Sequence, residues 1–291
     1  LDLIAARGSE PAISILRGNG DGTFQTAVNM EIPNPPQRLT TVDVNADDIE
    51  DLAVSNSGSN DISVLLGNGD GTLAVSASYV SANTPVAITS ADANVDGYTD
   101  LLVATMGSNT SVDVLIGDGT GSLWGGRTYG AGTPTSVTLA DFDGDQFIDT
   151  AYPSVVAGVN VVRVIIGTGD GAFSTSIDYP VGGSLVAARD INGDTYPDLA
   201  VADTQNDVVG VLLNQGDGTF GPVSTIPAGD GPDSLVLEDY DRDGDTDIIV
   251  SASSTSQVRI LQGDGEGSFS APNSYDCGIR PTGIAISDFN E

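Results

Sequence analysis

The sequence predicts an all-β fold, a β-propeller built from four-stranded antiparallel blades. Three observations carry this prediction. An acidic motif recurs every 49 residues, the apolar runs between its copies are short, β-branched and bounded by Gly, Asn, Asp and Pro, and no stretch shows helical periodicity. Four short strands in every 40 to 50 residues or so is the pattern of a propeller blade. The motif starts at Asp43, Asp92, Asp141, Asp190, Asp239 and Asp288.

Each repeat contains the same four segments in the same order. In one copy, the apolar run at residues 86–91 (VAITSA) leads into the acidic motif and is followed by residues 100–105 (DLLVAT). A Ser/Asn-rich turn precedes residues 112–117 (VDVLIG), and a Gly-Asp turn then leads to a weaker fourth segment. Several of these runs are apolar on both faces, as expected for sheets covered on both sides by their neighbours.

The turn between the third and fourth segments is itself repeated. It reads GNGDGTF from residue 18, GNGDGTL from residue 67, GTGDGAF from residue 167 and QGDGTF from residue 215. Asn-Gly and Asp-Gly pairs supply the positive φ that tight hairpin turns need. We therefore interpret these segments as hairpin turns, although their acids could also hold an ion.

The repeats predict how the strands are divided into blades. Asp2 lies 49 residues before Asp51, so the chain opens inside one copy, and it ends inside another. The N-terminal part then supplies strands two to four of one blade, five complete blades follow, and residues 282–288 supply a last strand one. We expect a single domain over residues 1–291, with six blades closed by pairing of that strand with the N-terminal three, which removes two exposed edges. Part of a larger ring and an open array remain alternatives.

The acidic motif has the composition of a calcium-binding loop. Positions one, three and five carry Asp or Asn, position nine carries Asp, and position six is often Gly. Ca²⁺ takes about six to eight oxygen ligands, which alternating side chains of a tight loop and the position-seven carbonyl can supply. Two carboxylates alone would suit Mg²⁺ as well, whereas three or four oxygen side chains favour the larger ion. The alternative is an Asp-rich turn without metal, in which neighbouring carboxylates would repel one another.

We therefore predict about five Ca²⁺ sites, each with four side-chain ligands and one backbone carbonyl. The predicted ligands, with the carbonyl residue fourth in each set, are Asp43, Asn45, Asp47, Ile49 and Asp51; Asp92, Asn94, Asp96, Tyr98 and Asp100; Asp141, Asp143, Asp145, Phe147 and Asp149; Asp190, Asn192, Asp194, Tyr196 and Asp198; and Asp239, Asp241, Asp243, Asp245 and Asp247. A sixth site would be split between the chain ends, and we expect it to be weak or empty; its residues are Asp2, Asp288 and Asn290.

Two other calcium motifs are excluded by spacing. An EF-hand needs a twelve-residue loop that ends in Glu between helices, whereas this loop ends at position nine between predicted strands. A nonapeptide β-roll would repeat every nine residues or so, which is far shorter than the period found here.

The motifs resemble those of the FG-GAP or VCBS repeat propellers, which include the head of integrin alpha chains. The resemblance rests on DANVDGYTDLLVA at 92–104, DINGDTYPDLAVA at 190–202 and DYDRDGDTDIIVS at 239–251, together with the GNGDGTF hairpins, and it spans essentially the whole chain. It implies that the acidic loop joins strands one and two of a blade and holds Ca²⁺. Rings of that family usually have seven blades, whereas six are counted here. The sequence also departs from the motif at position six, which is Asp48, Gln146 or Thr195 in three copies, and at position four, which is Gly144 or Gly193 in two of those.

The composition excludes several kinds of chemistry. The chain has no Lys and no His, so histidine base catalysis, His-ligated zinc and Schiff-base or P-loop lysine mechanisms lack their residues. A net charge of −32 repels nucleic acid and anionic lipid surfaces. Cys277 is the only cysteine, which rules out an intrachain disulfide, and we expect it to be an inert, half-buried thiol. No apolar run approaches the roughly 20 residues of a membrane span, and the chain starts without a leader pattern, as a processed product or an excerpt would.

These observations favour a non-catalytic module stabilised by calcium, with a role in binding, adhesion or scaffolding. We expect it to be secreted or at the cell surface, because intracellular calcium is too scarce for loops of this kind, whereas extracellular modules work with dissociation constants of about 10⁻⁴ to 10⁻³ M. Its partner would be a protein or glycan of the cell surface or matrix, or copies of itself.

Two other functions are kept as alternatives. A carbohydrate-binding, lectin-like propeller could stack sugars on Trp124, Tyr129 or Tyr179, although aromatic side chains chiefly fill cores. A calcium-dependent polysaccharide lyase or hydrolase would need a carboxylate pair, and every clear pair lies inside a predicted metal loop. Arg7, Arg38 and Arg280 could bind a partner's carboxylate, with solvated charge as the simpler interpretation.

Overall fold

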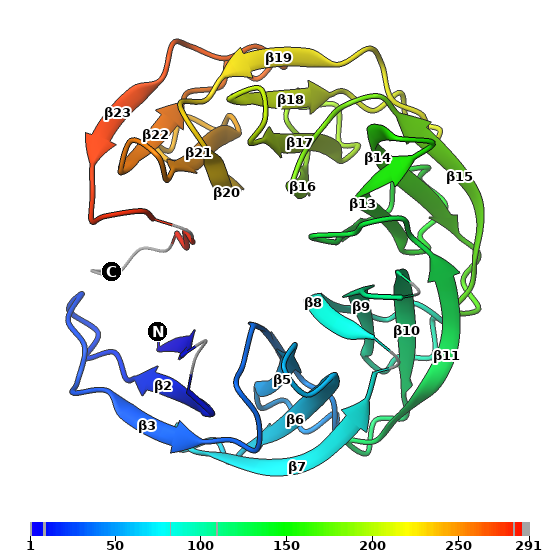
Figure 1. Cartoon of the computed structure of the whole chain (residues 1–291), viewed down its shortest axis with the longest axis vertical. Coiled ribbons are helices and arrows are strands. Elements are labelled where there is room, and N and C mark those ends of the chain that lie inside the picture. The colour runs from blue at the N-terminus through cyan, green and yellow to red at the C-terminus, as the bar shows by residue number, and fades with distance from the viewer. Residues whose placement is uncertain (1, 8–9, 82, 109, 282, 287–291) are drawn as a thin grey trace. The chain divides into compact units, whose positions relative to one another are not determined.

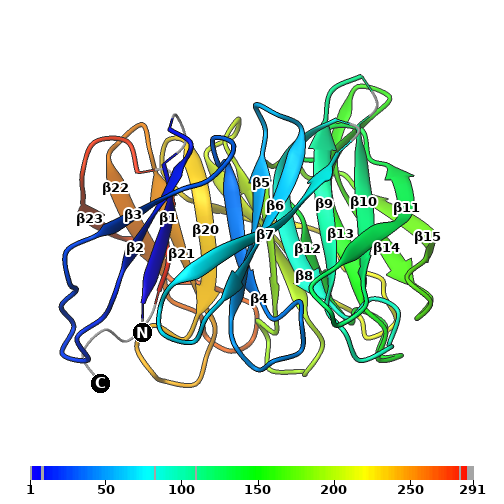
Figure 2. The same cartoon turned by 90° about the horizontal axis from the view of Figure 1, so that it is seen from below.

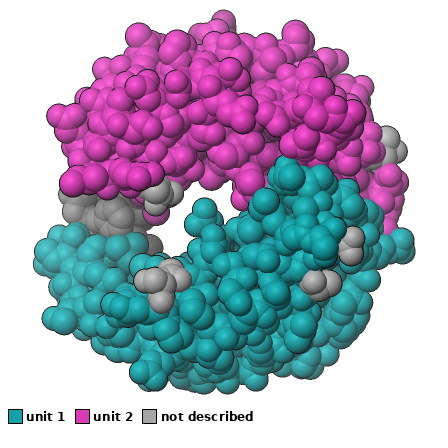
Figure 3. Space-filling model, in the orientation of Figure 1, with its two compact units in different colours: residues 1–134, 287–291 teal, residues 135–286 magenta. Residues whose placement is uncertain are grey.

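The computed structural model describes residues 2–7, 10–81, 83–108, 110–281 and 283–286. Within these residues every regular element is a β-strand, and 23 strands form six antiparallel sheets. The chain divides into two compact units, one of Leu1–Pro134 with Ser287–Glu291 and one of Thr135–Ile286 (Figure 3). We call them unit 1 and unit 2 and describe each by itself.

Unit 1 contains three sheets whose strands follow one another in chain order. The first has three strands, β1 (Leu3–Ala6), β2 (Ala12–Leu16) and β3 (Val28–Glu31). The second has β4 (Arg38–Val42), β5 (Asp51–Asn56), β6 (Asp61–Gly67) and β7 (Leu73–Val80). The third has β8 (Thr84–Ala91), β9 (Asp100–Met106), β10 (Ser111–Gly117) and β11 (Leu123–Gly130). The first strands of neighbouring sheets, β1, β4 and β8, contact one another in this order.

Unit 2 contains three four-stranded sheets of the same kind. They consist of β12 (Thr138–Ala140), β13 (Asp149–Val156), β14 (Val159–Gly167) and β15 (Phe173–Tyr179); of β16 (Leu185–Arg189), β17 (Asp198–Asp203), β18 (Val208–Leu212) and β19 (Ser224–Pro227); and of β20 (Pro232–Glu238), β21 (Asp247–Ala252), β22 (Gln257–Leu261) and β23 (Asn273–Asp276). Figures 1 and 2 show that the first strand of each sheet lies on one side of it and the last strand on the other.

These meanders of four antiparallel strands are propeller blades, so the predicted all-β propeller fold class is confirmed. The sheet of β1–β3 has one strand fewer because the chain opens inside a repeat, as predicted. Residues 283–286 form no strand, and residues 282 and 287–288 lie outside the described residues. The pairing of residues 282–288 with β1 therefore stays a prediction, as does the single domain over residues 1–291.

The core lies between the sheets, because each blade is apolar on both faces. The second strands β5, β17 and β21 are buried along their whole length, whereas the fourth strands β7 and β11 are mostly exposed. In unit 2, one core cluster joins Phe142 and Val164 of one blade to Leu199 and Phe220 of the next. Burial of such side chains contributes about 1.5–3 kcal/mol each.

Tyrosines of the fourth strands tie neighbouring blades together. The hydroxyl oxygen of Tyr79 on β7 accepts a hydrogen bond from Leu123 N at 3.0 Å in the next sheet. In unit 2 the Tyr179 oxygen accepts one from Phe220 N at 2.9 Å. These two tyrosines pair with Ile62 and Val162 of their third strands, so they occupy the same place in their blades.

The hairpins between third and fourth strands have the predicted geometry. Gly20 and Gly22 have φ of 80° and 82°, and Asn19 N donates to Thr23 O at 2.9 Å across the turn. In four hairpins the Asp is followed two residues later by a Thr, whose hydroxyl and backbone N–H both donate hydrogen bonds to the Asp carboxylate. These bonds lower the pKa of Asp21, Asp70, Asp118 and Asp217. Turn chemistry thus accounts for Gly, Asp and Thr at these positions.

Candidate metal centres

Each acidic motif forms a loop between the first and second strands of a blade. Position one follows the last residue of the first strand, and position nine is the first residue of the second strand. Asp43, for example, follows β4 and Asp51 begins β5. The predicted ligands of one motif are therefore gathered at one end of one blade.

The position-nine aspartates are buried and fully engaged. Each is at most 1% exposed. One carboxylate oxygen accepts the N–H of position two of the same loop at 2.6–3.1 Å. The other oxygen accepts an N–H at the end of the third strand or just after it, at 2.7–2.8 Å. The donors at the third strand are Gly67, Gly117, Gly167, Asn214 and Gly263, and the acceptors are Asp51, Asp100, Asp149, Asp198 and Asp247. Each position-nine side chain thus joins its loop to the third strand.

Glycine at the third-strand donor position follows from this close approach. A Cβ on Gly117 would overlap the carbonyl oxygen of Thr99, and one on Gly167 would overlap that of Ile148. These carbonyls belong to position eight of the loops, and backbone cannot easily move aside. Asn214 replaces the glycine in one blade, where its side-chain amide donates to the carbonyls of Phe142 and Pro197, both at 2.9 Å.

Positions one and five close the loop on themselves. Asp43 accepts the N–H groups of Asp47 and Asp48 on its two oxygens, at 3.3 and 3.0 Å. Where position four is Gly, as in the loop of Asp141, Gly144 N donates in place of the position-five N–H. In all five loops the position-five carboxylate accepts the N–H of position seven at 2.8–2.9 Å.

The backbone is left-handed at positions four and six of every loop. These residues have φ between 57° and 100°, although most are not glycine. They are Ala46 and Asp48, Val95 and Gly97, Gly144 and Gln146, Gly193 and Thr195, and Arg242 and Gly244. The departures from glycine at position six therefore change the side chain and leave the loop conformation unaltered.

Burial raises the pKa of all five position-nine carboxyl groups. The pKa of Asp149 rises to about 7 and that of Asp198 to about 6, with desolvation as the largest cause and the backbone N–H bonds opposing it. The pKa of Asp51, Asp100 and Asp247 is raised for the same reason. Asp143 and Asp245 also have a raised pKa, since neighbouring carboxylates add to the desolvation. A cation at these loops would favour the ionised forms.

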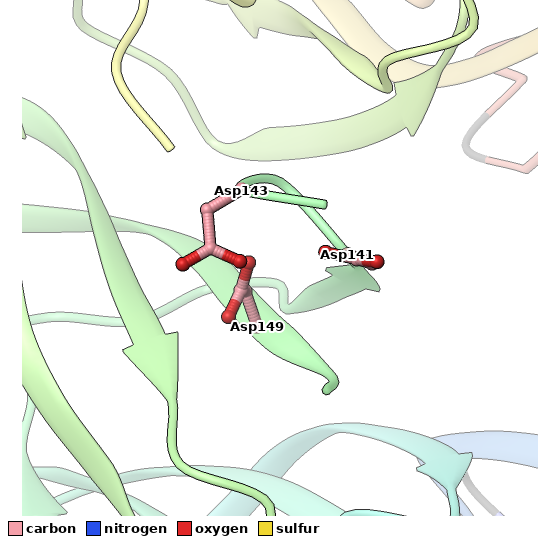
Figure 4. Close-up of side chains that lie close together, drawn as sticks. All are labelled: Asp141, Asp143 and Asp149. Carbon is pink, nitrogen blue, oxygen red and sulfur yellow. The ribbon is translucent and has the colours of Figure 1, made fainter. Parts of the chain in front are cut away.

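Two loops bring three carboxylates together as a metal site requires. One oxygen from each of Asp141, Asp143 and Asp149 lies within 4.8 Å of the others, and the same holds for Asp239, Asp241 and Asp247. Figure 4 shows the three carboxyl groups of the first set gathered at the loop. Carboxylate oxygens at positions one, three and nine are the type of ligand that Ca²⁺ prefers. These three positions include both the first and the last residue of the loop.

The other three loops have Asn at position three, so they have one carboxylate fewer among the predicted ligands. The amide of Asn45 donates to the carboxylate of Asp47 at 2.9 Å, and Asn94 and Asn192 do the same with Asp96 and Asp194. The ligand roles predicted for position five and for the position-seven carbonyl stay predictions in all five loops.

Part of the predicted split site has the same geometry. Asp2 accepts the N–H of Gly18 at 2.9 Å, the bond that every position-nine aspartate makes to its third strand. Asp288 and Asn290, the other predicted members, lie outside the described residues.

Sequence reasoning missed the contact between each loop and the following hairpin. The position-seven side chain lies against the first hairpin glycine, so a Cβ there would meet Ile49 at Gly69, Tyr98 at Gly119, Phe147 at Gly169, Tyr196 at Gly216 and Asp245 at Gly265. The repeated Gly of the hairpin motif was the available signal. Because these glycines also have positive φ, the repeat by itself does not distinguish the contact from turn conformation.

The residues singled out by sequence outside the acidic loops differ in their exposure and contacts. Trp124 is 50% exposed, whereas Tyr179 is partly buried and joins two blades, as packing predicts. Arg7 forms an ion pair with Glu10 at 2.9 Å. Cys277 is exposed, so the expectation of a half-buried thiol is wrong, because it follows β23, a fourth strand that is exposed throughout.

Comparison with known proteins supplies a family and a fold. A family model described as FG-GAP-like repeat matches residues 43–103, 190–250 and 239–291. No curated protein matches the chain. The described residues contain no helix with the length and apolarity that crossing a membrane requires.

Solved structures share the fold at low sequence identity. A functionally unknown protein from Desulfotomaculum acetoxidans is 13% identical, with a TM-score of 0.74 over 94% of this chain and 80% of that one. A protein from Lactobacillus plantarum is 15% identical, with a TM-score of 0.72 over 97% and 84%. Virginiamycin B lyase from Staphylococcus aureus is 13% identical, with a TM-score of 0.61 over 98% and 85%.

Proposed function

This chain belongs to the FG-GAP-like repeat family, whose model matches more than half of it, and on this premise we propose that it is a calcium-stabilised, non-catalytic binding or scaffold module. Its five acidic loops would each hold one Ca²⁺. The observation that carries the proposal is the convergence of three carboxylate oxygens within 4.8 Å in the loops that start at Asp141 and Asp239.

The ion would act on structure in this proposal. Its ligands at position one and position nine stand at the ends of neighbouring strands, and position nine is bonded to the third strand as well. A bound Ca²⁺ would offset the repulsion among carboxylates that already lie close together, so it would stiffen three strands of each blade.

A catalytic role is disfavoured by the same geometry. Asp149 has a pKa of about 7, which is the range of a general acid, yet it is fully buried and both of its oxygens accept backbone N–H groups. A bound Ca²⁺ would hold this carboxyl group in its ionised form, whereas a general acid must carry a proton. We therefore propose that the acidic loops do no chemistry.

The proposed setting is extracellular, secreted or at the cell surface. The net charge of −32 and the absence of Lys support a partner other than nucleic acid, such as a protein or glycan of the cell surface or matrix, or another copy of the chain. Extracellular calcium suffices for modules with dissociation constants of about 10⁻⁴ to 10⁻³ M. An adhesion role is part of this proposal.

Native mass spectrometry and thermal unfolding test the calcium proposal. We expect about five Ca²⁺ per chain in calcium-containing buffer and a Tm that falls by about 10 °C or more in EDTA, since a site filled at 100 times its Kd adds about 2.7 kcal/mol. Asp143→Asn should weaken one site. Asp118→Asn, on a hairpin, is the matched control and should leave the ion count unchanged. An EDTA-insensitive Tm with no bound calcium would refute the proposal.

Sugar binding is the second candidate, and the exposure of Trp124 favours it. An exposed Trp can stack on a sugar ring, since its large apolar face is free. A glycan array in calcium buffer, run with the parent chain and with Trp124→Ala, tests this candidate. Sugar binding requires that the parent chain binds a glycan on the array and that Trp124→Ala abolishes this binding. An array on which the parent chain binds no glycan would eliminate this candidate.

A further inference from the structure

A cavity of about 190 Å³ lies between the second and third sheets of unit 1. Ile62 of β6 and the residues Val80 and Ser81 at the end of β7 form one wall, and residues of β9, β10 and β11 form the other. A single water needs about 10–15 Å³ of such space, so a ligand of several atoms fits. Val80 is 90% exposed, so the cavity opens to the surface. None of the lining residues belongs to an acidic loop.

Two polar side chains line the cavity from opposite walls. Ser81 is 9% exposed, and its buried hydroxyl oxygen has no hydrogen-bond partner among the described residues. Asp113 of β10 accepts a hydrogen bond from Ser111 Oγ at 2.9 Å on one carboxylate oxygen, and within the same part of the chain its second oxygen accepts none. Buried polar groups are normally hydrogen-bonded, so the cavity holds acceptors that a ligand could satisfy.

Ser81 is a polar residue at an apolar place of the blade. The backbone N–H of Ile32, Ser81 and Ala228 each bonds a carbonyl in the loop that precedes the third strand of its own sheet. These three residues therefore occupy equivalent places, just after the fourth strand. Ile32 is 4% exposed and Ala228 is 0% exposed, so both are buried apolar residues. The hydroxyl of Ser81 replaces part of the apolar packing that the other two provide.

The outer wall of the cavity lacks a side chain that another blade has. Gly125 on β11 pairs with Leu115, whereas Val75 takes the corresponding place on β7, opposite Leu65. No atom lies within 4 Å of the position that a Cβ would take at Gly125. Gly125 and Leu115 both line the cavity, so a valine side chain at residue 125 would extend into open space there.

Asp113 is the one acid at its position of the third strand. Four residues before the N–H donor to the position-nine aspartate, or to Asp2, the sequence has Ser14, Ser63, Asp113, Arg163, Gly210 and Arg259. Arg163 is paired within its own sheet, because its guanidinium donates to Asp178 on the neighbouring strand at 2.6 and 2.9 Å. The residue opposite Asp113 at the same register is Thr128, which carries no charge.

Arg127 borders the cavity without neutralising Asp113. The register of β10 and β11 shifts between Asp113 and Leu115, which leaves Gly126 and Arg127 both opposite Val114. Successive residues of a strand point to opposite faces, so Val114 and Arg127 belong to the face of the sheet opposite Asp113. Within the described residues, no Arg forms an ion pair with Asp113.

We propose that this cavity is a binding site for a primary ammonium group carried on a short aliphatic chain. The ammonium group donates to the second oxygen of Asp113 and to Ser81 Oγ, and the aliphatic chain contacts Ile62, Val103 and Leu115. An ammonium group has three donors and no acceptor, which matches this pair of acceptors. Its charge compensates the carboxylate that the sheet leaves unpaired.

The composition of the chain supports a cationic ligand from another molecule. A net charge of −32 raises the local concentration of cations, and the chain has no Lys of its own to fill the site. The ammonium group belongs either to a free amine or to a lysine side chain of a partner protein, because the two share the same chain and head group. The proposal goes beyond the calcium-stabilised module and does not depend on the acidic loops.

NMR titration of the calcium-loaded chain in amine-free buffer tests the site. n-Butylammonium chloride and n-butanol are matched probes, since they share the apolar chain and differ in the charged group. We expect the amide signals of Ser81, Gly125 and Gly126 to shift and saturate with n-butylammonium, and n-butanol to bind at least about tenfold more weakly. Equal affinities, or no saturable shift with n-butylammonium, would overturn the proposal.

Two variants separate the charge of the site from its space. Asp113→Asn should weaken n-butylammonium binding by at least about tenfold. Gly125→Val should abolish binding without lowering the Tm, because its side chain occupies the cavity. Asp233→Asn on β20 of unit 2 is the matched control, since Asp233 is half-buried like Asp113, and it should leave binding unchanged. Parent-like binding by Asp113→Asn or by Gly125→Val would overturn the proposal.

A lysine residue capped at both ends distinguishes the two sources of the ammonium group. It carries the same aliphatic chain on a backbone that must stay outside the cavity. Binding as tight as that of n-butylammonium would assign the site to a partner's lysine, whereas binding of n-butylammonium alone would assign it to a free amine. Native mass spectrometry of the same variants should show an unchanged calcium count, so failure at this site is distinguishable from failure of the calcium proposal.

Discussion

Two residues in each acidic loop hold a left-handed backbone, and in the first loop neither is glycine. Val95, at position four of the second loop, has φ of 57° and is 56% exposed. A β-branched residue is a rare occupant of this conformation, which costs a non-glycine residue about 1–2 kcal/mol. The loop therefore keeps its turn at the expense of local strain, as is common where a backbone must surround a ligand.

Replacement of this valine by glycine should stabilise the protein. Val95→Gly removes the strain and loses little packing, while the added chain entropy costs about 0.5–1 kcal/mol, so we expect a gain of up to about 1 kcal/mol. Chemical denaturation measures it. Val80→Gly is the control, since Val80 is 90% exposed in the strand β7 and should be destabilised by the same change. A loss of stability at residue 95 would contradict the strain argument.

The acidic loops differ in the charge of the residue at position three. Asp143 and Asp241 add a carboxylate where the other loops have Asn45, Asn94 or Asn192. Because the number of charged ligands tunes calcium affinity, we expect the loops that start at Asp141 and Asp239 to bind most tightly. Calorimetric titration of Asp143→Asn should show one strong site converted to a weaker one, while Asn94→Asp should strengthen one. Unchanged Ca²⁺ affinities in both variants would show that the charge at position three does not determine the affinity.

At the scale of elements, a glycine of the third strand lets the loop and the strand approach. Gly117 donates to Asp100 at 2.8 Å, and a Cβ at this glycine would overlap the Thr99 carbonyl oxygen. The buried carboxylate needs this donor, since an unpaired buried group costs about 1–3 kcal/mol. Loop, second strand and third strand are therefore one structural element held by a single side chain.

Gly117→Ala should disrupt that element. The added methyl group meets backbone, so we expect a loss of about 1–3 kcal/mol or more and weaker calcium binding at the loop of Asp92. Gly125→Ala in β11 is the control, because no atom lies within 4 Å of its Cβ position. Thermal unfolding with and without calcium measures both, and equal Tm values for the two variants would contradict the steric argument.

At the scale of the whole molecule, the acidic loops and the net charge of −32 both disfavour the fully ionised folded chain. Without an ion, each position-nine carboxyl group has a pKa above its ordinary value, because burial disfavours its charge. At these groups the folded chain then holds more protons than the unfolded chain, up to about pH 7 for Asp149. Their contribution to stability is therefore lost as pH rises through the raised pKa values.

Calcium should reverse this dependence. In EDTA we expect a higher Tm at pH 5.5 than at pH 8, because the protonated form of Asp149, with its pKa of about 7, is favoured in the folded state. With calcium in excess, protons compete with the ion, so the Tm should be higher at pH 8. Scanning calorimetry at both pH values checks the sign. A higher Tm at pH 8 in EDTA would show that the buried carboxyl groups do not titrate as described.

The sequence by itself determined most of the strands, the hairpins and the positions of five acidic loops, because these follow from local turn chemistry and from a spacing that repeats along the chain. Only the tertiary structure decided that the position-nine aspartate is buried, that its partner is a third-strand N–H sixteen to eighteen residues away, and that the position-seven side chain covers a hairpin glycine. Those contacts depend on how strands pair and how blades pack, and local sequence carries little information on either.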